Sequence, residues 1–155
     1  MIEAGANMRG ELAQAREIIA PTVTVTTNVV LSHLDGFGSL EGILEEELEL
    51  LEDVPLALVG TEPPSLADAA RLKAQRVLTV GLARADRVPQ SVSMDSTGRA
   101  TLMVEGLRIT LPLLGQHQAS NAMLAWTLGQ ELSIDPSAAA EASGAANSRR
   151  TRGNH

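Results

Sequence analysis

The 155-residue chain is acidic: 19 Asp and Glu against 12 Lys and Arg give a formal net charge of −7 at pH 7, which argues against a nucleic-acid or anionic-membrane binder. Hydrophobic residues make up 44% of the chain, enough for a core, and the absence of cysteine excludes disulfides and thiolate metal sites. No apolar run approaches the roughly 18 residues that cross a membrane. Residues 1–10 do not resemble a signal peptide, so we expect no membrane insertion and a cytoplasmic location.

The first half of the chain alternates predicted helices with predicted strands. Residues 2–4 resemble the end of a strand, apolar spacing predicts a helix over 10–20, and the β-branched run 22–27 predicts a strand. A serine-capped helix is predicted at 39–52, followed by a short aliphatic strand at 56–59. A second serine-capped helix at 65–75 and a second strand at 76–80 come next. This alternation favours a parallel sheet with helices on its faces.

The second half changes character. Three extended segments joined by turns, at 91–96, 100–105 and 108–113, predict a small antiparallel meander. Helices are predicted at 117–132 and at 136–142. From 143 the residues are small, polar and basic, so we expect one domain over 1–142 and a disordered tail over 143–155.

Three polar segments stand where such a fold would place a ligand. Glu3 precedes a glycine turn, Asn28 follows a predicted strand and leads to His33 in a glycine-rich stretch, and residues 115–122 open a helix. Open α/β sheets bind ligands at the carboxyl ends of their strands and at helix starts. Taken singly, each segment has a simpler interpretation: Glu3 as a solvated residue, His33 as loop packing and Asn121 as a surface or capping residue.

Taken together, three motifs resemble a known family. I-E-A-G-A-N-x-x-G-E at 2–11, H-L-x-G-F-G-S-L-E-G-I at 33–43 and G-x-H-x-x-x-N at 115–121 resemble, in order and spacing, the central ATP-binding domain of the Mur ligases. The first two motifs resemble in particular the members that add D-alanyl-D-alanine, and the third resembles the family's nucleotide-binding segment. The resemblance covers about residues 2–142. It implies an α/β fold: a mainly parallel sheet flanked by helices, P-loop-type but truncated here, with a small antiparallel β meander.

The resemblance also implies roles for individual residues. Glu3 and His33 would lie at the magnesium sites, and Asn28 beside the γ-phosphate and the acyl phosphate, so that His33 and Asn28 are the candidate catalytic residues. Asn121 would contact the adenine end of ATP, with His117 and Gln118 next to it. The implied cofactors are therefore ATP and Mg²⁺.

The chemistry that the family implies is acyl activation. ATP phosphorylates a substrate carboxylate, an amine attacks, and a tetrahedral intermediate collapses to an amide, ADP and phosphate. The implied substrates are UDP-N-acetylmuramoyl-tripeptide and D-alanyl-D-alanine. Magnesium would offset the negative charges that meet in this step.

Four features depart from the family pattern. The 155 residues contain no G-x-x-G-K-[ST] loop and no third domain, and Gln118 stands where the family usually has Asn. Glu47 occupies the position of a lysine that is carbamylated to hold magnesium, which makes its carboxylate a candidate metal ligand. The alternative is a solvated acidic face, because the predicted helix and the residues just after it carry seven acidic residues between Glu41 and Asp53.

These departures lead to the expectation that the chain is a fragment which does not perform the family reaction alone. The alternative is a non-catalytic Mur-like domain kept for binding or assembly. A related ligase that adds another amino acid is disfavoured by the motifs at 2–11 and 33–43.

Overall fold

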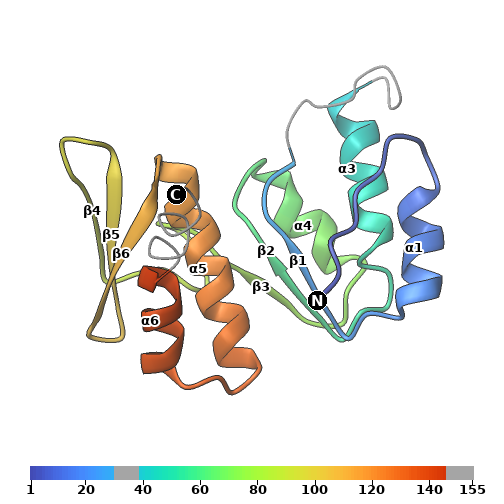
Figure 1. The fold of residues 1–155 in the computed structure, drawn as a ribbon. Coiled ribbons are helices and arrows are strands. Elements are labelled where there is room, and N and C mark those ends of the chain that lie inside the picture. The colour runs from blue at the N-terminus through green and yellow to red at the C-terminus, as the bar shows by residue number, and fades with distance from the viewer. Residues whose placement is uncertain (30–38, 146–155) are drawn as a thin grey trace, which may run out of the picture. The chain divides into compact units, whose positions relative to one another are not determined.

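The computed structural model describes residues 1–29 and 39–145, apart from the side chains of residue 40 and residues 142–145. The chain divides into two compact units (Figure 1), one over Met1–Thr79 and one from Val80 onward. The predicted segment around His33 lies outside the described residues.

The first unit is built on a three-stranded parallel sheet. Strands β1 (Val23–Thr26), β2 (Leu56–Val59) and β3 (Val77–Thr79) lie in the order β1-β2-β3. β2 is buried along its whole length, as expected for the central strand of a parallel sheet. The predicted parallel sheet is confirmed.

Three helices accompany this sheet: α1 (Glu11–Ile19), α3 (Leu40–Glu49) and α4 (Ser65–Arg71). The predicted cap of α3 is confirmed, because the Ser39 hydroxyl accepts a 3.1 Å hydrogen bond from the Gly42 amide. α1 packs beside α3, as Figure 1 shows.

The core of this unit lies between the sheet and helices α3 and α4. Ala57 and Val59 of β2 belong to one buried cluster with side chains of both helices. The helix residues in this cluster are Ile43, Leu48, Leu66 and Ala70. Small and branched aliphatic side chains make the layer, as expected for a chain with almost no aromatic residues.

The second unit has an antiparallel sheet and two helices. Strands β4 (Ser91–Met94), β5 (Arg99–Val104) and β6 (Leu107–Leu114) follow one another in the sheet, which confirms the predicted meander. α5 (Gln116–Glu131) contacts β5 and β6, and α6 (Pro136–Ala145) contacts β6. Alternate residues of β5 are buried, namely Ala100, Leu102 and Val104.

Some predicted boundaries in the first unit are wrong. Residues 2–4 form no strand, and among the described strands β1 pairs only with β2. α4 ends at Arg71 rather than at 75, because the chain after it pairs with another segment: the Asp53 amide donates to the Lys73 carbonyl at 3.0 Å. Ser65 is the first residue of α4 and not its cap.

In the second unit, α6 runs three residues beyond its expected end at 142. The helix is initiated by Asp135, whose carboxylate accepts from the Ala138 amide at 3.0 Å. Its alanine-rich sequence favours continuation to Ala145. Residues 146–155 lie outside the described part, so the tail and the 1–142 domain boundary stay predictions.

Candidate functional site

The carboxyl edge of the parallel sheet carries the first candidate residues. Asn28 lies two residues beyond β1 and is exposed. The segment that carries it runs beside the segment after β2: the Gly60 amide donates to the Thr26 carbonyl at 2.8 Å, and the Val29 amide donates to the Glu62 carbonyl at 3.1 Å. Asn28 is therefore held at the sheet edge where an open α/β sheet binds ligands.

Gly60 makes this arrangement possible and was missed by the sequence analysis. A Cβ atom at Gly60 would lie 1.7 Å from the Thr27 carbonyl oxygen and 3.1 Å from Asn28 Oδ1. Only a residue without a side chain lets the two backbones approach so closely. A glycine directly after an aliphatic strand is the signal that indicates such an approach.

Glu3 lies in an exposed segment before α1. The chain that follows it is held by two carboxylates. Glu11 accepts from the amides of Asn7 (2.7 Å) and Met8 (3.2 Å), which lowers the pKa of its carboxyl. Glu46 of α3 accepts from the amides of Gly10 (2.7 Å) and Leu12 (2.9 Å). The backbone donors at the start of α1 are thus taken by the protein's own carboxylates.

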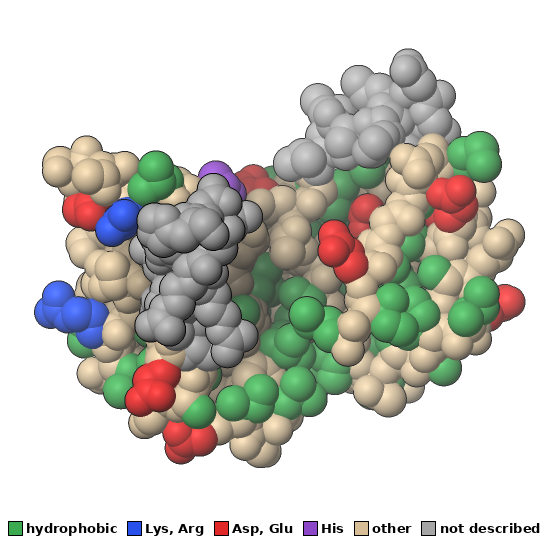
Figure 2. Space-filling model, viewed as in Figure 1, with side chains coloured by type: hydrophobic (Ala, Val, Ile, Leu, Met, Phe, Trp, Pro, Cys, Tyr) green, Lys and Arg blue, Asp and Glu red, His purple; other side chains and the backbone are tan. Residues whose placement is uncertain are grey.

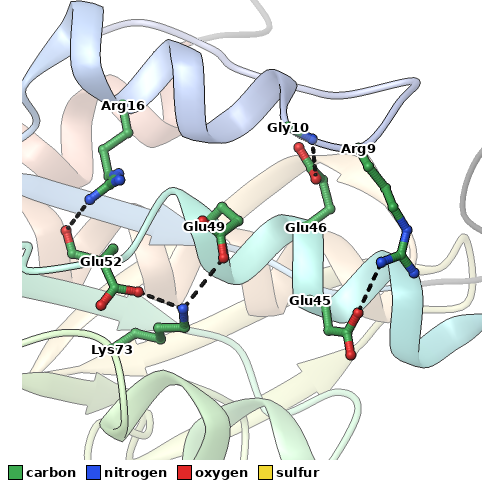
Figure 3. A network of polar contacts seen from close by, with 8 residues as sticks. All are labelled: Arg9, Gly10, Arg16, Glu45, Glu46, Glu49, Glu52 and Lys73. Atoms are coloured by element: carbon green, nitrogen blue, oxygen red, sulfur yellow. Dashed lines mark hydrogen bonds and ion pairs between the residues drawn. The ribbon is translucent and has the colours of Figure 1, made fainter.

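The acidic residues of α3 differ in exposure, so the predicted solvated face holds for Glu41 and Glu45 but not for Glu46. Glu46 is only 5% exposed. Figure 3 shows that its neighbours also have partners: Glu45 pairs with Arg9 at 3.3 Å, and Glu49 pairs with Lys73 at 3.4 Å. The carboxylates of this helix therefore hold α1 and the segment after α4 against α3.

Lys73, the only lysine in the chain, is engaged in the same network. Its ammonium lies 2.5 Å from Glu52 and 3.4 Å from Glu49. The hydrogen bond to Glu52, followed by the one to Glu49, raises the pKa of Lys73 despite an opposing effect of desolvation. Carbamylation needs a neutral amine, so this lysine is a poor substitute for the one that the family resemblance implies at position 47.

Glu47 is half-buried on α3. Burial raises the pKa of its carboxyl, and the charge of the neighbouring Glu46 raises it further. No described group of three or more His, Asp and Glu side chains lies close enough together to hold a metal ion. The described residues therefore do not by themselves fit Mg²⁺, and the assignment of Glu3, His33 and Glu47 to the metal stays a prediction.

The pKa of Glu47 gives a prediction for stability. A carboxyl whose pKa is raised by folding favours the folded state when protonated and opposes folding when ionised. Glu47→Gln is therefore expected to raise the melting temperature at pH 7, and the difference from the parent should vanish as pH falls below the unfolded pKa, about 4.3. Melting curves by circular dichroism at pH 7 and near pH 4 measure both; a lower melting temperature at pH 7 would contradict the burial penalty.

In the second unit, the start of α5 gathers the three residues predicted to lie at the adenine end. His117 and Asn121 are exposed and lie one helical turn apart. Gln118, which follows His117 in the sequence, is half-buried. The Gln118 side-chain nitrogen lies 3.1 Å from His117 Nε2. Gly115, with φ 103°, precedes the helix, and a Cβ there would lie 2.7 Å from His117 Cε1.

The surface adds two observations. The face drawn in Figure 2 has no broad patch of Lys and Arg among its described side chains, in keeping with the net charge. Within residues 1–29 and 39–145, none of the helices is both long and apolar enough to cross a membrane.

Comparison with known sequences identifies relatives of the chain. The UDP-N-acetylmuramoyl-tripeptide–D-alanyl-D-alanine ligase of Bacillus subtilis is 32% identical over 147 residues, which cover 91% of this chain and 31% of the relative. The UDP-N-acetylmuramate–L-alanine ligase of Thermobifida fusca is 32% identical over 135 residues, 80% of this chain and 28% of the relative. The chain thus spans about a third of the length of these proteins.

Comparison with solved structures finds the same fold. The match to MurF from Acinetobacter baumannii covers 92% of this chain and 33% of the MurF chain. Its TM-score is 0.77 and the sequence identity is 22%. The match to MurF ligase from Thermotoga maritima in complex with ADP covers 87% of this chain and 34% of the MurF chain. Its TM-score is 0.69 and the sequence identity is 23%. The model of the Mur ligase middle domain matches residues 1–129. The chain therefore belongs to the Mur ligase middle domain family.

Proposed function

We propose that the chain is the nucleotide-binding part of an ATP-dependent amide ligase that makes peptidoglycan precursors. The observation that carries this proposal is the polar start of α5, where the side chains of His117 and Asn121 are exposed. It lies within a middle domain that matches the family over residues 1–129. The ADP complex of the Thermotoga maritima relative supports a nucleotide as the ligand of such a domain.

Within this class, we favour the joining of D-alanyl-D-alanine to UDP-N-acetylmuramoyl-tripeptide. The activity for which the Bacillus subtilis relative is named supports this substrate pair, and the motifs at 2–11 and 33–43 agree with it. The Thermobifida fusca relative, named for L-alanine and UDP-N-acetylmuramate, supplies the competing pair. A cytoplasmic location goes with the proposal.

Each unit carries its own candidate residues for this chemistry. In the second unit, the Asn121 amide would donate to and accept from the edge of adenine, as a side-chain amide does with this base. In the first, Asn28 at the sheet edge would donate to oxygen atoms of the phosphate or acyl phosphate. Magnesium would supply charge neutralisation in the reaction, although no group of three or more acidic or histidine side chains among the described residues could hold it.

Adenosine binding tests the proposal. In ¹⁵N-labelled chain, millimolar adenosine is expected to shift the amide signals of residues 115–121, and Asn121→Ala is expected to weaken the response about tenfold, the loss of one or two hydrogen bonds. Guanosine serves as the ligand control because its O6 accepts a hydrogen bond where the N6 amino group of adenine donates one. Equal responses to adenosine and guanosine, or no response at residues 115–121, would refute the nucleotide site.

The second candidate function, a non-catalytic Mur-like domain kept for binding or assembly, is favoured by Glu47, which stands where the family resemblance implies a carbamylated lysine. The 155 residues hold no G-x-x-G-K-[ST] loop, whose backbone amides and lysine bind the phosphates. Calorimetry of the chain with Mg-ATP is therefore expected to show no binding tighter than millimolar. Phosphate release with either substrate pair is expected at background level, and turnover with one pair would decide both the activity and the substrate.

A further inference from the structure

A pocket of about 300 Å³ lies at the edge of the parallel sheet where the strands begin. Its lining includes Pro21, two residues before β1, and the buried Val54, two residues before β2. Asn28 and Gly60 follow the same two strands, so they lie at the other edge of the sheet. A volume of this size is at the lower end of the range for small-molecule sites. The pocket is therefore a candidate site separate from the nucleotide and metal residues assigned above.

Arg16 supplies the positive charge of the pocket. It reaches from α1 to the segment after α3 (Figure 3), where its Nη1 donates to the Glu52 backbone carbonyl at 3.3 Å. Its Nε atom is buried and has no hydrogen-bond partner within residues 1–29 and 39–145. A buried N–H without an acceptor costs free energy, so this guanidinium gains from a ligand that accepts from it. The planar fork of guanidinium donors matches a carboxylate.

Glu17 and Asp53 supply negative charge from the two walls of the pocket. Both residues are exposed, and within the described part of the chain neither carboxylate has a hydrogen-bond or ion-pair partner. Glu52 also lines the pocket, but its carboxylate is paired with the Lys73 ammonium at 2.5 Å. The charges left for a ligand are thus one guanidinium and two carboxylates.

The backbone fixes both walls of the pocket. The wall formed by α1 ends at Ala20, which has a positive φ of 47° and donates from its amide to the Arg16 carbonyl at 2.8 Å. In the other wall Asp53 has a positive φ of 59°, and its amide donates to the Lys73 carbonyl at 3.0 Å. The Asp53 carbonyl accepts from the Gln75 side chain at 3.1 Å. A ligand therefore meets walls that are already in place, which lowers the entropy cost of binding.

We propose that this pocket binds a small zwitterion, an amino acid or a short peptide. The ligand's carboxylate pairs with Arg16, and its ammonium group pairs with Glu17 and Asp53. A simple anion would bring its charge close to two carboxylates, and a simple cation would leave the guanidinium unused, so a ligand with both charges is the one that matches all three residues. This site lies beyond the proposed function and does not depend on it.

Titration of ¹⁵N-labelled chain with L-alanyl-L-alanine tests the proposal. The amide signals of residues 16–20 and 52–54 are expected to shift, with a dissociation constant of about 1 mM because the paired charges stay partly in water. N-acetyl-L-alanyl-L-alanine lacks the ammonium group, and L-alanyl-L-alaninamide lacks the carboxylate. Each should bind at least about tenfold more weakly, since each loses hydrogen bonds between charged groups.

Variants of the lining residues locate the ligand. Glu17→Gln and Asp53→Asn should each weaken binding about threefold, and the double variant about tenfold. Both side chains are exposed and asparagine tolerates a positive φ, so these variants keep the fold. Arg16→Gln should weaken binding at least about tenfold, and the two carboxylate variants carry the test if it does not fold. Glu41→Gln, exposed on α3 and outside the pocket, is the matched control and should bind as the parent chain does.

The source of the zwitterion is decided by alanine. Binding of alanine as tight as that of the dipeptide would support the site with an amino acid as its ligand, and binding at least about tenfold weaker would support it with a short peptide. Equal binding of either blocked dipeptide would overturn the zwitterion. No shift in residues 16–20 and 52–54 at about 10 mM dipeptide, ten times the expected dissociation constant, would overturn the site.

Discussion

Gly60→Ala is expected to lower the free energy of unfolding by about 3 kcal/mol or more. The cost is placed at the upper end of the usual range for overpacking because the added atom meets backbone. The added Cβ would lie 1.7 Å from the Thr27 carbonyl oxygen and 2.9 Å from its carbon, both backbone atoms that cannot turn aside. The segments after β1 and β2 must then separate, which breaks the 2.8 Å hydrogen bond from the Gly60 amide to the Thr26 carbonyl. Urea unfolding followed by circular dichroism measures the change.

Gly5→Ala is the matched control for this substitution. Gly5 is exposed, and a Cβ built on it would have no atom within 4 Å. Its replacement is expected to change stability by no more than about 0.5 kcal/mol. Equal unfolding midpoints for the two variants would mean that the strands do not approach each other at Gly60.

Glu46→Gln is expected to cost about 2 to 3 kcal/mol of stability. The two carboxylate oxygens of Glu46 accept from the Gly10 and Leu12 amides at 2.7 and 2.9 Å, and the side chain is 5% exposed. Glutamine has one oxygen and one NH₂ group, so one buried backbone N–H would face another donor and lose its partner. The start of α1 has no other side-chain cap to replace it.

Glu45→Gln provides the comparison, one residue earlier on the same helix. Glu45 and its partner Arg9 have side chains that are 69% and 60% exposed, so their ion pair is screened by water. Its loss is expected to cost no more than about 0.5 kcal/mol. A similar loss for both variants in chemical denaturation would show that burial does not distinguish the two carboxylates.

The elements that were predicted correctly are those with a local signal. Ser39 precedes an apolar helical pattern, and it caps α3 as expected. The aliphatic run of β2 and the turns of the meander also follow from neighbouring residues. These elements can be predicted from neighbouring residues because their hydrogen bonds, or the periodicity of their apolar side chains, involve residues close in sequence.

The features that were missed depend on partners far away in the sequence. Gly60 must be glycine because of Thr27: a glycine directly after a strand indicates a close approach, but the residues next to it do not identify Thr27 as the partner. Glu46 is one of seven acidic residues in its region, and its role depends on amides 34 to 36 residues earlier. In the candidate site, the third motif predicted where α5 places its polar residues, but the contact of Gln118 with the His117 ring depends on side-chain geometry that a motif does not specify.

The long-range cap of α1 has a consequence for the order of folding. α1 has nine residues, fewer than the roughly 12 to 15 below which an isolated helix is marginal in water. The amides of its first turn can bind Glu46 only after the intervening loop of more than thirty residues has formed. Closing this loop costs chain entropy. We therefore expect α1 to form late in the folding of its unit, and its first turn to open in the native state together with its contact to α3.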